Sequence, residues 1–357
     1  ILLLDMIMMP VLFFISGILA WPSYERKGAY RFLAGKVKRL IIPFLFCTFL
    51  FSPIMPFIRE ALRAMNSGGD SIDFLSFWLN FFQNSLNIQS GGVATSTELT
   101  VNQYWFLMLL FLFFAGFSLY AWLQGRIEKS RMSIFSKTPG SRTGWLSLIA
   151  AFSIVLGVIY AVICMFIDGT TWVTFGGLWQ FQPAKIHIYL GLFLAGIYVE
   201  RRKTLVGIIN IARPAMWLAV AILFIMAYLI SVMKTMGVPD ASVIWVTASR
   251  LLRLLVLMSV LLWLLTFFNR YVNRSTLIWQ ELSSNSYNVY LIHMPPLVVI
   301  QLWALSWPVP STFKFLMVSL LTLLLSYLIS RILVRRFPVV TVFLLFFLFI
   351  LMVLVFP

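Results

Sequence analysis

The chain has 357 residues, of which 61% are hydrophobic and 11% are charged, and its formal net charge at pH 7 is +16. Soluble domains contain about 45–50% apolar and about 25% charged residues, so this composition excludes an ordinary soluble protein. The excess of basic residues does not indicate nucleic-acid binding, because these residues form short clusters between apolar runs rather than one basic patch. We therefore predict a membrane protein with no nucleic-acid partner.

Uninterrupted apolar runs of helix-spanning length recur along the chain. A transmembrane barrel would instead show segments of about ten residues with alternating polarity. We therefore predict an all-α fold, a polytopic transmembrane helical bundle of about ten spans that forms one membrane-embedded domain over residues 1–357. The chain begins inside an apolar run, and we expect a further piece upstream of Ile1.

The first half of the chain holds four predicted spans between loops of opposite character. Residues 24–39 include six basic side chains, which the positive-inside rule places in the cytoplasm. Residues 59–103 carry four acidic and two basic side chains and suit an extracytoplasmic loop, in which residues 72–86 are expected to form an amphipathic interfacial helix. The predicted spans are residues 1–21, 40–58, 104–123 and 145–167.

The second half adds six predicted spans, and its basic clusters again fall on alternate loops. Trp172 and Trp179 lie in the short loop before the first of these spans and are expected to belong to an aromatic belt. The predicted spans are residues 187–199, 214–233, 244–268, a run that contains residues 283–296, and residues 313–334 and 339–355.

Residues 283–296 place polar groups inside an otherwise apolar run. Ser286, Tyr290 and His293 stand at i, i+4 and i+7, so a helix presents them on one face. Pro295 and Pro296 are expected to interrupt the helix just beyond the histidine. A polar stripe inside a span is costly unless it faces a partner or a water-filled cavity, so this stretch is a candidate site.

A metal site is not expected. The two histidines, His187 and His293, are isolated from each other and from any cluster of acidic residues, which makes a poor set of ligands. Cys47 and Cys164 lie in apolar runs far apart in the sequence and are predicted to be small core residues.

Five segments occur in the order of the motifs of one known family. They read FFISGIL (residues 13–19), RLIIP (39–43), YWFL (104–107), YLGLFLAG (189–196) and SYNVYLIH (286–293). These segments are similar to FF-x-SG-x-L, RL-x-x-P, LWFL, Y-x-x-x-F-x-x-G and SYG-x-YL-x-H. The chain thus resembles acyltransferase family 3, integral-membrane enzymes that include surface-polysaccharide O-acetyltransferases and the succinyltransferase of periplasmic glucans.

The resemblance implies a multi-pass O-acyltransferase of the bacterial inner membrane. It would take an acyl group from cytosolic acyl-CoA, with acetyl-CoA the foremost donor, and deliver it to a hydroxyl of a cell-surface or periplasmic glycan. Acyl-CoA is then a co-substrate rather than a permanently bound cofactor, and the partners are membrane lipids and a glycan or lipid-linked glycan. Family members place a histidine regarded as catalytic in a span before the FF-x-SG helix, so the resemblance also implies such a helix ahead of Ile1.

Acyl transfer to a hydroxyl needs a base that takes up the proton and donors that stabilise the developing oxyanion. His293 is the candidate base, with Tyr290 and Ser286 beside it as further catalytic candidates, because histidine as a residue type titrates near neutral pH. The alternative remains open that His293 is a buried structural residue, bonded to Tyr290, to Ser286 or to a backbone carbonyl.

Two further groups of residues are candidate binding residues. Basic side chains next to the membrane either bind the CoA phosphates or set the topology and contact lipid headgroups. Arginines within a span usually face a cavity or a partner, and aromatic residues at the start of a span either stack on sugar or adenine rings or belong to an aromatic belt. The CoA-binding candidates are Lys36, Lys38 and Arg39, and the substrate-binding candidates are Arg250, Arg253, Trp105 and Tyr104.

Two other functions compete with an active acyltransferase. The first is a carrier or flippase for a lipid-linked or anionic glycan, with Arg250 and Arg253 along its path and no covalent chemistry. A carrier is expected to show an internal repeat with broken helices at matching positions, and the sequence shows neither. The second is an inactive fragment of an acyltransferase.

Overall fold

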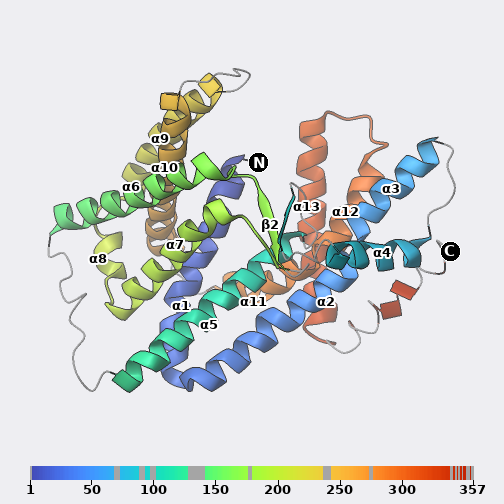
Figure 1. Ribbon diagram of the computed structural model, residues 1–357, viewed down its shortest axis with the longest axis horizontal. Helices are drawn as coiled ribbons and strands as arrows, with labels where there is room; N and C mark the ends of the chain where they lie inside the picture. The colour runs from blue at the N-terminus through green and yellow to red at the C-terminus, as the bar shows by residue number, and fades with distance from the viewer. Residues whose placement is uncertain are drawn as a thin grey trace.

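The computed structural model describes residues 2–67, 73–87, 93–96, 102–127, 141–175, 179–235, 243–272 and 276–337, with isolated positions between 341 and 354. Helices make up most of these residues, which confirms the all-α prediction (Figure 1). The helical elements are α1 (Leu2–Lys36), η1 (Val37–Ile41), α2 (Ile42–Phe51), α3 (Ile54–Ser67), α4 (Phe74–Asn87), η2 (Asn102–Tyr104), α5 (Trp105–Ile127), α6 (Arg142–Phe166), α7 (Pro183–Arg201), α8 (Leu205–Ile209), α9 (Pro214–Thr235), α10 (Val243–Tyr271), α11 (Leu277–Ile292), α12 (Met294–Ala304), α13 (Ser311–Ile329) and η3 (Ser330–Val334).

Six helical stretches in the described part are long and apolar enough to cross a membrane. The prediction of about ten spans is not confirmed. Charged residues, among them Lys185, stand at both ends of α7, and α11 and α12 have only 16 and 11 residues. The predicted span over residues 339–355 lies largely outside the described residues. The six stretches are Met6–Ala61, Trp105–Gln124, Arg142–Phe166, Pro214–Thr235, Val243–Tyr271 and Ser311–Val334.

The first of these stretches turns back on itself near Gly28. Gly28 has φ 69° and ψ 168°, a conformation that glycine adopts at little cost and other residues rarely adopt. The rings of Tyr24 and Phe32 lie 5.8 Å apart, whereas eight residues of straight helix would separate them by about 12 Å. Figure 1 shows the chain leaving the base of α1 and rising again towards α2. The basic residues predicted for a cytoplasmic loop therefore flank this turn.

Helices α1 and α7 cross at two glycines and form one of the most extensive helix contacts. A Cβ atom on Gly17 would lie 2.1 Å from the carbonyl oxygen of Phe193, and one on Gly196 would lie 2.2 Å from that of Phe14. Both distances are far below van der Waals contact with a backbone that cannot easily move. Small residues let membrane helices approach closely, so these glycines hold together two of the five motif segments.

A small antiparallel sheet joins two segments that the sequence predicts as extracytoplasmic loops. Strand β1 (Val93–Ser96) pairs with β2 (Trp172–Phe175), placing Val93 opposite Phe175, and β2 pairs with β3 (Trp179–Phe181). These strands were not predicted, because three or four residues are too few to show an alternating pattern. Hydrogen-bonded strands must lie on the same side of a membrane, so the sheet agrees with the predicted placement of both loops.

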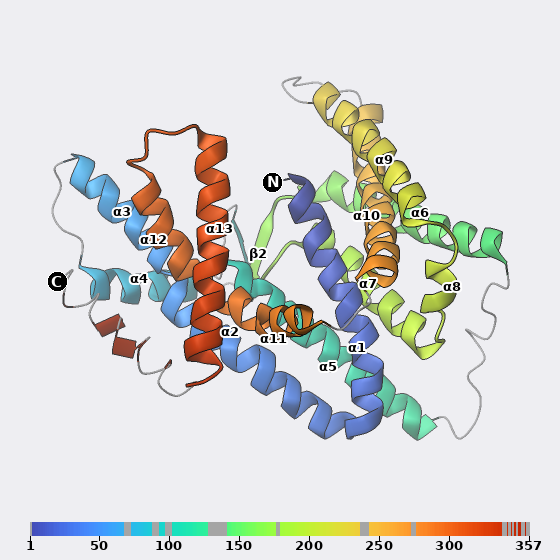
Figure 2. The ribbon, with the colours of Figure 1, turned by 180° about the vertical axis from the view of Figure 1, so that it is seen from behind.

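Two clusters of buried side chains form most of the core on either side of α7. The first combines residues of α1, α2, α5 and α7 with the partly buried face of α11, and the second lies mainly between α6, α7 and α10. Cys47 and Cys164 are buried in the first and second cluster, as predicted. Helices α12 and α13 pack side by side and form a smaller cluster of their own (Figure 2).

Candidate functional site

The five motif segments, far apart in the sequence, meet in the first core cluster. Phe13 of α1 stacks on Tyr189 of α7, with ring centroids 4.9 Å apart and an interplanar angle of 22°. Phe106 of α5 contacts Phe13 edge-on at 4.9 Å and lies 6.3 Å from the ring of Tyr290 in α11. Leu40 of η1 is buried in the same cluster. These segments form one packed region, which we call the motif core.

Three tyrosine hydroxyl groups attach α11 to the motif core. Each bond joins residues far apart in sequence, and each acceptor is a backbone carbonyl oxygen. The donor and acceptor pairs are Tyr290 to Gln103 at 2.7 Å, Tyr104 to Leu291 at 2.9 Å, and Tyr287 to Arg39. These bonds reach both the start of α5 and the basic η1 segment, and they fix the C-terminal part of α11 against the motif core.

His293 lies at the break between α11 and α12, which the sequence predicts from Pro295 and Pro296. Its Nδ1 lies 2.8 Å from the backbone carbonyl oxygen of Tyr290, and its side chain is half-buried. A carbonyl oxygen can only accept a hydrogen bond, so Nδ1 is the donor of this bond and, in that neutral tautomer, the lone pair lies on Nε2. The histidine is thus bonded to a backbone carbonyl, as the structural alternative expects, and Nε2 can still take up a proton.

Ser286 does not join Tyr290 and His293 in a hydrogen-bonded triad. Its hydroxyl donates to the carbonyl oxygen of Ser283 at 2.8 Å, within its own helix, and its side chain is exposed. In the part of the chain that the structure describes, no hydrogen bond links the side chains of Ser286, Tyr290 and His293. The helical spacing therefore aligns three residues that the tertiary structure uses separately.

The three basic residues predicted to bind the CoA phosphates have different surroundings. The Nζ of Lys36 lies 3.6 Å from the centre of the Phe114 ring and 5.2 Å from that of Phe32, which is cation–π geometry. Lys38 and Arg39 are exposed on the π-helical turn η1. Their side chains are the ones that a phosphate group can reach from solvent.

Tyr104 and Trp105, predicted to stack on a sugar or adenine ring, are packed inside the protein. Tyr104 is 0% exposed and Trp105 is 5% exposed. The Trp105 ring lies 5.5 Å from that of Trp172 and 5.7 Å from that of Tyr189. Both residues thus pack against other aromatic and polar groups of the motif core rather than against an open binding surface.

Arg250 and Arg253, predicted to act on the substrate together, differ in what they contact. Arg250 donates through Nη2 to the carbonyl oxygen of Cys164 at 3.0 Å and through Nη1 to that of Ala161 at 3.4 Å. The last carbonyls of a helix lack partners within it and carry partial negative charge. Arg250 therefore caps the end of α6. The guanidinium group of Arg253 instead lies 5.5 Å from the centre of the Tyr160 ring and faces a pocket.

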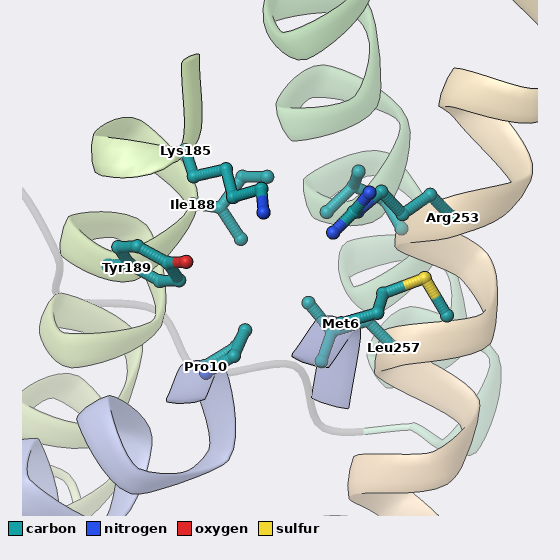
Figure 3. Close-up of a pocket in the computed structure, with 8 residues that line it drawn as sticks. Met6, Pro10, Lys185, Ile188, Tyr189, Arg253 and Leu257 are labelled. Carbon is teal, nitrogen blue, oxygen red and sulfur yellow. The ribbon is translucent and has the colours of Figure 1, made fainter. Parts of the chain in front are cut away.

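This pocket lies between the start of α7, the first turns of α1 and the middle of α10 (Figure 3). Figure 3 shows the Lys185 ammonium and the Arg253 guanidinium turned toward each other across it, with the Tyr189 hydroxyl facing the same space. Lys185 is only 6% exposed. Lys185 was not among the residues predicted from the sequence, although its spacing of i, i+4 to Tyr189 places both on one face of α7. The other lining residues are Met6, Pro10, Ile188, Leu254 and Leu257.

The second histidine does not belong to the motif core. The Nε2 of His187 lies 3.1 Å from the carbonyl oxygen of Leu156, and its ring lies 6.3 Å from that of Tyr160. It therefore serves the contact between α6 and α7. Within the described ranges, no three His, Cys, Asp or Glu side chains are grouped so that they could hold a metal ion.

Comparison with known proteins gives one match. Residues 1–331, out of 357, match the family model described as an acyltransferase domain, the domain of acyltransferase family 3. No curated protein and no solved structure matches the chain. The matched range contains all five motif segments and every residue that lines the pocket.

Proposed function

The chain belongs to acyltransferase family 3, and we propose that it transfers an acetyl or succinyl group from cytosolic acyl-CoA to a hydroxyl of a cell-surface or periplasmic glycan. In this proposal acyl-CoA is a co-substrate and the protein works in the bacterial inner membrane. Family membership supports the acyltransferase class, and the six stretches of membrane-crossing length support a multi-pass membrane protein.

The observation that carries the proposal is the packing of the five motif segments around α11. The hydroxyl of Tyr287 donates a hydrogen bond to the Arg39 carbonyl in the basic η1 turn. His293 comes six residues after Tyr287, which is a distance of about 9 Å along the helix axis. A CoA molecule whose phosphates contact Lys38 and Arg39 can therefore direct its extended pantetheine arm along α11 towards His293. The donor-binding residues of η1 then lie beside Tyr287 in the second half of α11, and the base lies just beyond the C-terminal end of that helix.

The reaction follows from the position of the proton on His293. The Nε2 lone pair takes the proton from the acceptor hydroxyl while the hydroxyl oxygen attacks the thioester carbonyl carbon. The new C–O bond forms, the C–S bond breaks, and the CoA thiolate leaves and takes up the proton from the imidazolium. The carbonyl oxygen of Tyr290 holds the Nδ1 proton throughout and keeps the ring oriented.

The experiment is a transfer assay with the purified protein in detergent. Acetyl-CoA or succinyl-CoA labelled in the acyl group is incubated with oligosaccharide acceptors, and ester-linked label in the glycan is measured by mass spectrometry. Label in the glycan supports the acyltransferase. Movement of a glycan across proteoliposomes without any acylation would contradict it and favour a carrier.

A further inference from the structure

Gln103 carries a buried hydrogen-bond donor that has no partner. The residue lies in η2, directly before the YWFL segment with which α5 begins. Its side-chain Nε2 is shielded from solvent and makes no hydrogen bond with the part of the chain that the structure describes. An N–H group in this position has lost its bonds to water without a replacement, which destabilises the folded chain. Such a group needs an explanation, and a ligand that binds there is one.

Other buried side-chain amides in the described ranges do have partners. The Nε2 of Gln180 donates to a threonine hydroxyl at 2.9 Å, and the Nε2 of Gln182 donates to a backbone carbonyl oxygen at 3.3 Å. The Nδ2 of Asn285 donates to the carbonyl oxygen of Glu281 at 2.8 Å. The amide of Gln103 differs from these three because its donor is buried and unpaired at the edge of the motif core.

Two hydrogen bonds hold Gln103 next to the proposed base. The Tyr290 hydroxyl donates to the backbone carbonyl oxygen of Gln103 at 2.7 Å, and the Tyr290 ring lies 6.3 Å from the ring of His293. The hydroxyl of Tyr104, the following residue, donates to the carbonyl oxygen of Leu291 at 2.9 Å. These contacts bring the η2 turn to the last turn of α11, where the chain reaches the histidine.

The same place favours a negative charge. The η2 turn precedes the N-terminal end of α5, a helix of 23 residues, and the N-terminal end of a helix carries partial positive charge. Tyr104, Trp105 and Phe106 are buried there, so little water weakens the field of the helix end. A negatively charged oxygen that forms beside Gln103 would therefore gain from the helix end as well as from the unpaired N–H group.

We propose that the side-chain amide of Gln103 donates a hydrogen bond to the carbonyl oxygen of the acyl thioester while that oxygen becomes negative. When the acceptor hydroxyl oxygen attacks the carbonyl carbon, the π electron pair of the C=O bond moves onto the oxygen, and the amide N–H stabilises this charge. The pair returns as the C–S bond breaks and the thiolate leaves. This inference rests on the proposed function and deepens it, because it names a donor for the developing oxyanion.

The test compares the kinetics and the stability of Gln103→Met with those of the wild type, using labelled acetyl-CoA and an oligosaccharide acceptor. Methionine has nearly the shape of glutamine but no N–H donor. We expect kcat to fall by about 10²–10³-fold, the usual effect of losing one oxyanion donor, with a nearly constant KM for acetyl-CoA. The melting temperature should stay the same or rise, because an apolar group replaces an unpaired donor. Gln103→Asn keeps the amide on a shorter side chain, so its kcat should lie between these values.

Ser118→Ala is the matched control. Ser118 is 1% exposed, and its hydroxyl is also buried without a partner among the described residues. It lies in α5 about 20 Å along the axis from the first residue of that helix. Its loss should leave the melting temperature unchanged or raised, as in Gln103→Met, but should change kcat by about twofold or less. An equal fall of kcat in both variants would refute a specific role of Gln103.

Two results with Gln103→Met would overturn the proposal. A kcat close to that of the wild type would indicate that a water molecule pairs the amide instead of the thioester. A lower kcat together with a lower melting temperature would make Gln103 a structural residue. Both results leave the proposed function standing, because the wild type transfers acyl groups in each. Folded wild-type protein that transfers no acyl group to any glycan would instead contradict the proposed function, and with it the role of Gln103.

Discussion

At the scale of single residues, His293 is the group on which the proposed chemistry depends. The bond from Nδ1 to the Tyr290 carbonyl leaves Nε2 as the proton acceptor. Replacing His293 by alanine should therefore lower kcat by about 10²–10⁴-fold, the usual contribution of a positioned general base. The KM for acyl-CoA should stay nearly constant, because the residue is not proposed to bind the donor. Steady-state kinetics with labelled acetyl-CoA measures both constants.

Ser286→Ala is the control for this prediction. Ser286 lies in the same helix but is exposed and bonds only its own helix, so its loss should change the rate by about twofold or less. An equal loss of kcat in both variants would refute the assignment of His293 as the base and would indicate damage to α11.

Arg250 is predicted to act on stability rather than on substrate binding. Arg250→Gln removes a charged donor from the carbonyl groups of Cys164 and Ala161 and should lower the free energy of unfolding by about 1–3 kcal/mol. Thermal unfolding in detergent measures the change, with Arg270→Gln as an exposed control. A normal melting temperature together with a raised acceptor KM would show that Arg250 binds substrate after all.

The two arginines of α10 also show what the sequence can predict at this scale. Residues three apart share a helix face, and this spacing predicts that Arg250 and Arg253 act together on the substrate. Their different partners depend on α6, 86 and 89 residues earlier in the chain, and on the pocket made with α1 and α7. Local spacing contains no information on such contacts. For the same reason it grouped Ser286 with His293, although the two side chains are used separately.

At the scale of elements, the crossing of α1 and α7 makes a sharp prediction. Gly17→Ala and Gly196→Ala each place a Cβ about 2 Å from a carbonyl oxygen, so each should destabilise the protein by about 1–3 kcal/mol or more. The control is Gly116→Ala in α5, where a Cβ meets nothing within 4 Å and better helix propensity should give up to about 1 kcal/mol of stabilisation. Thermal unfolding of the three variants tests this prediction. Similar melting temperatures in all three would contradict the close crossing of α1 and α7.

Several elements could be predicted because their signals are local. The helix expected over residues 72–86 is α4, Phe74–Asn87, and the break expected beyond His293 separates α11 from α12. The three-stranded sheet could not be predicted, because its short strands are formed by pairing between segments about 80 residues apart. The predicted number of about ten spans is not confirmed, because charged residues stand at both ends of α7 and because α11 and α12 have only 16 and 11 residues.

At the scale of the whole molecule, the order of the motifs can be read from the sequence, but the packing of the motif segments against one another cannot be predicted from it. Phe13, Phe106, Tyr189 and Tyr290 come from four helices and become neighbours only through long-range packing. The sequence also predicts which loops share a side of the membrane, and the sheet that joins β1 to β2 agrees with that arrangement. Motif order thus indicates the family, and long-range packing determines which motif residues are buried against one another.

This topology predicts that the basic turn η1 and the three-stranded sheet lie on opposite sides of the membrane. Lys38 of η1 and Trp179 of β3 are exposed, so Lys38→Cys and Trp179→Cys should be labelled from opposite faces of sealed vesicles by a membrane-impermeant maleimide. The native Cys47 and Cys164 are buried and should react slowly. Labelling of both introduced cysteines from one face would contradict the topology and, with it, the path of the acyl group across the membrane.

The most direct test of acyl transfer across the membrane uses sealed proteoliposomes whose outer face carries the η1 turn. Acetyl-CoA labelled in the acetyl group is added outside, and an oligosaccharide acceptor is enclosed inside. We predict that the enclosed glycan acquires ester-linked acetyl groups with the wild type and not with His293→Ala. Label that stays in acetyl-CoA or appears only as free acetate, with folded wild-type protein, would contradict the assignment of this protein as a membrane acyltransferase acting on glycans.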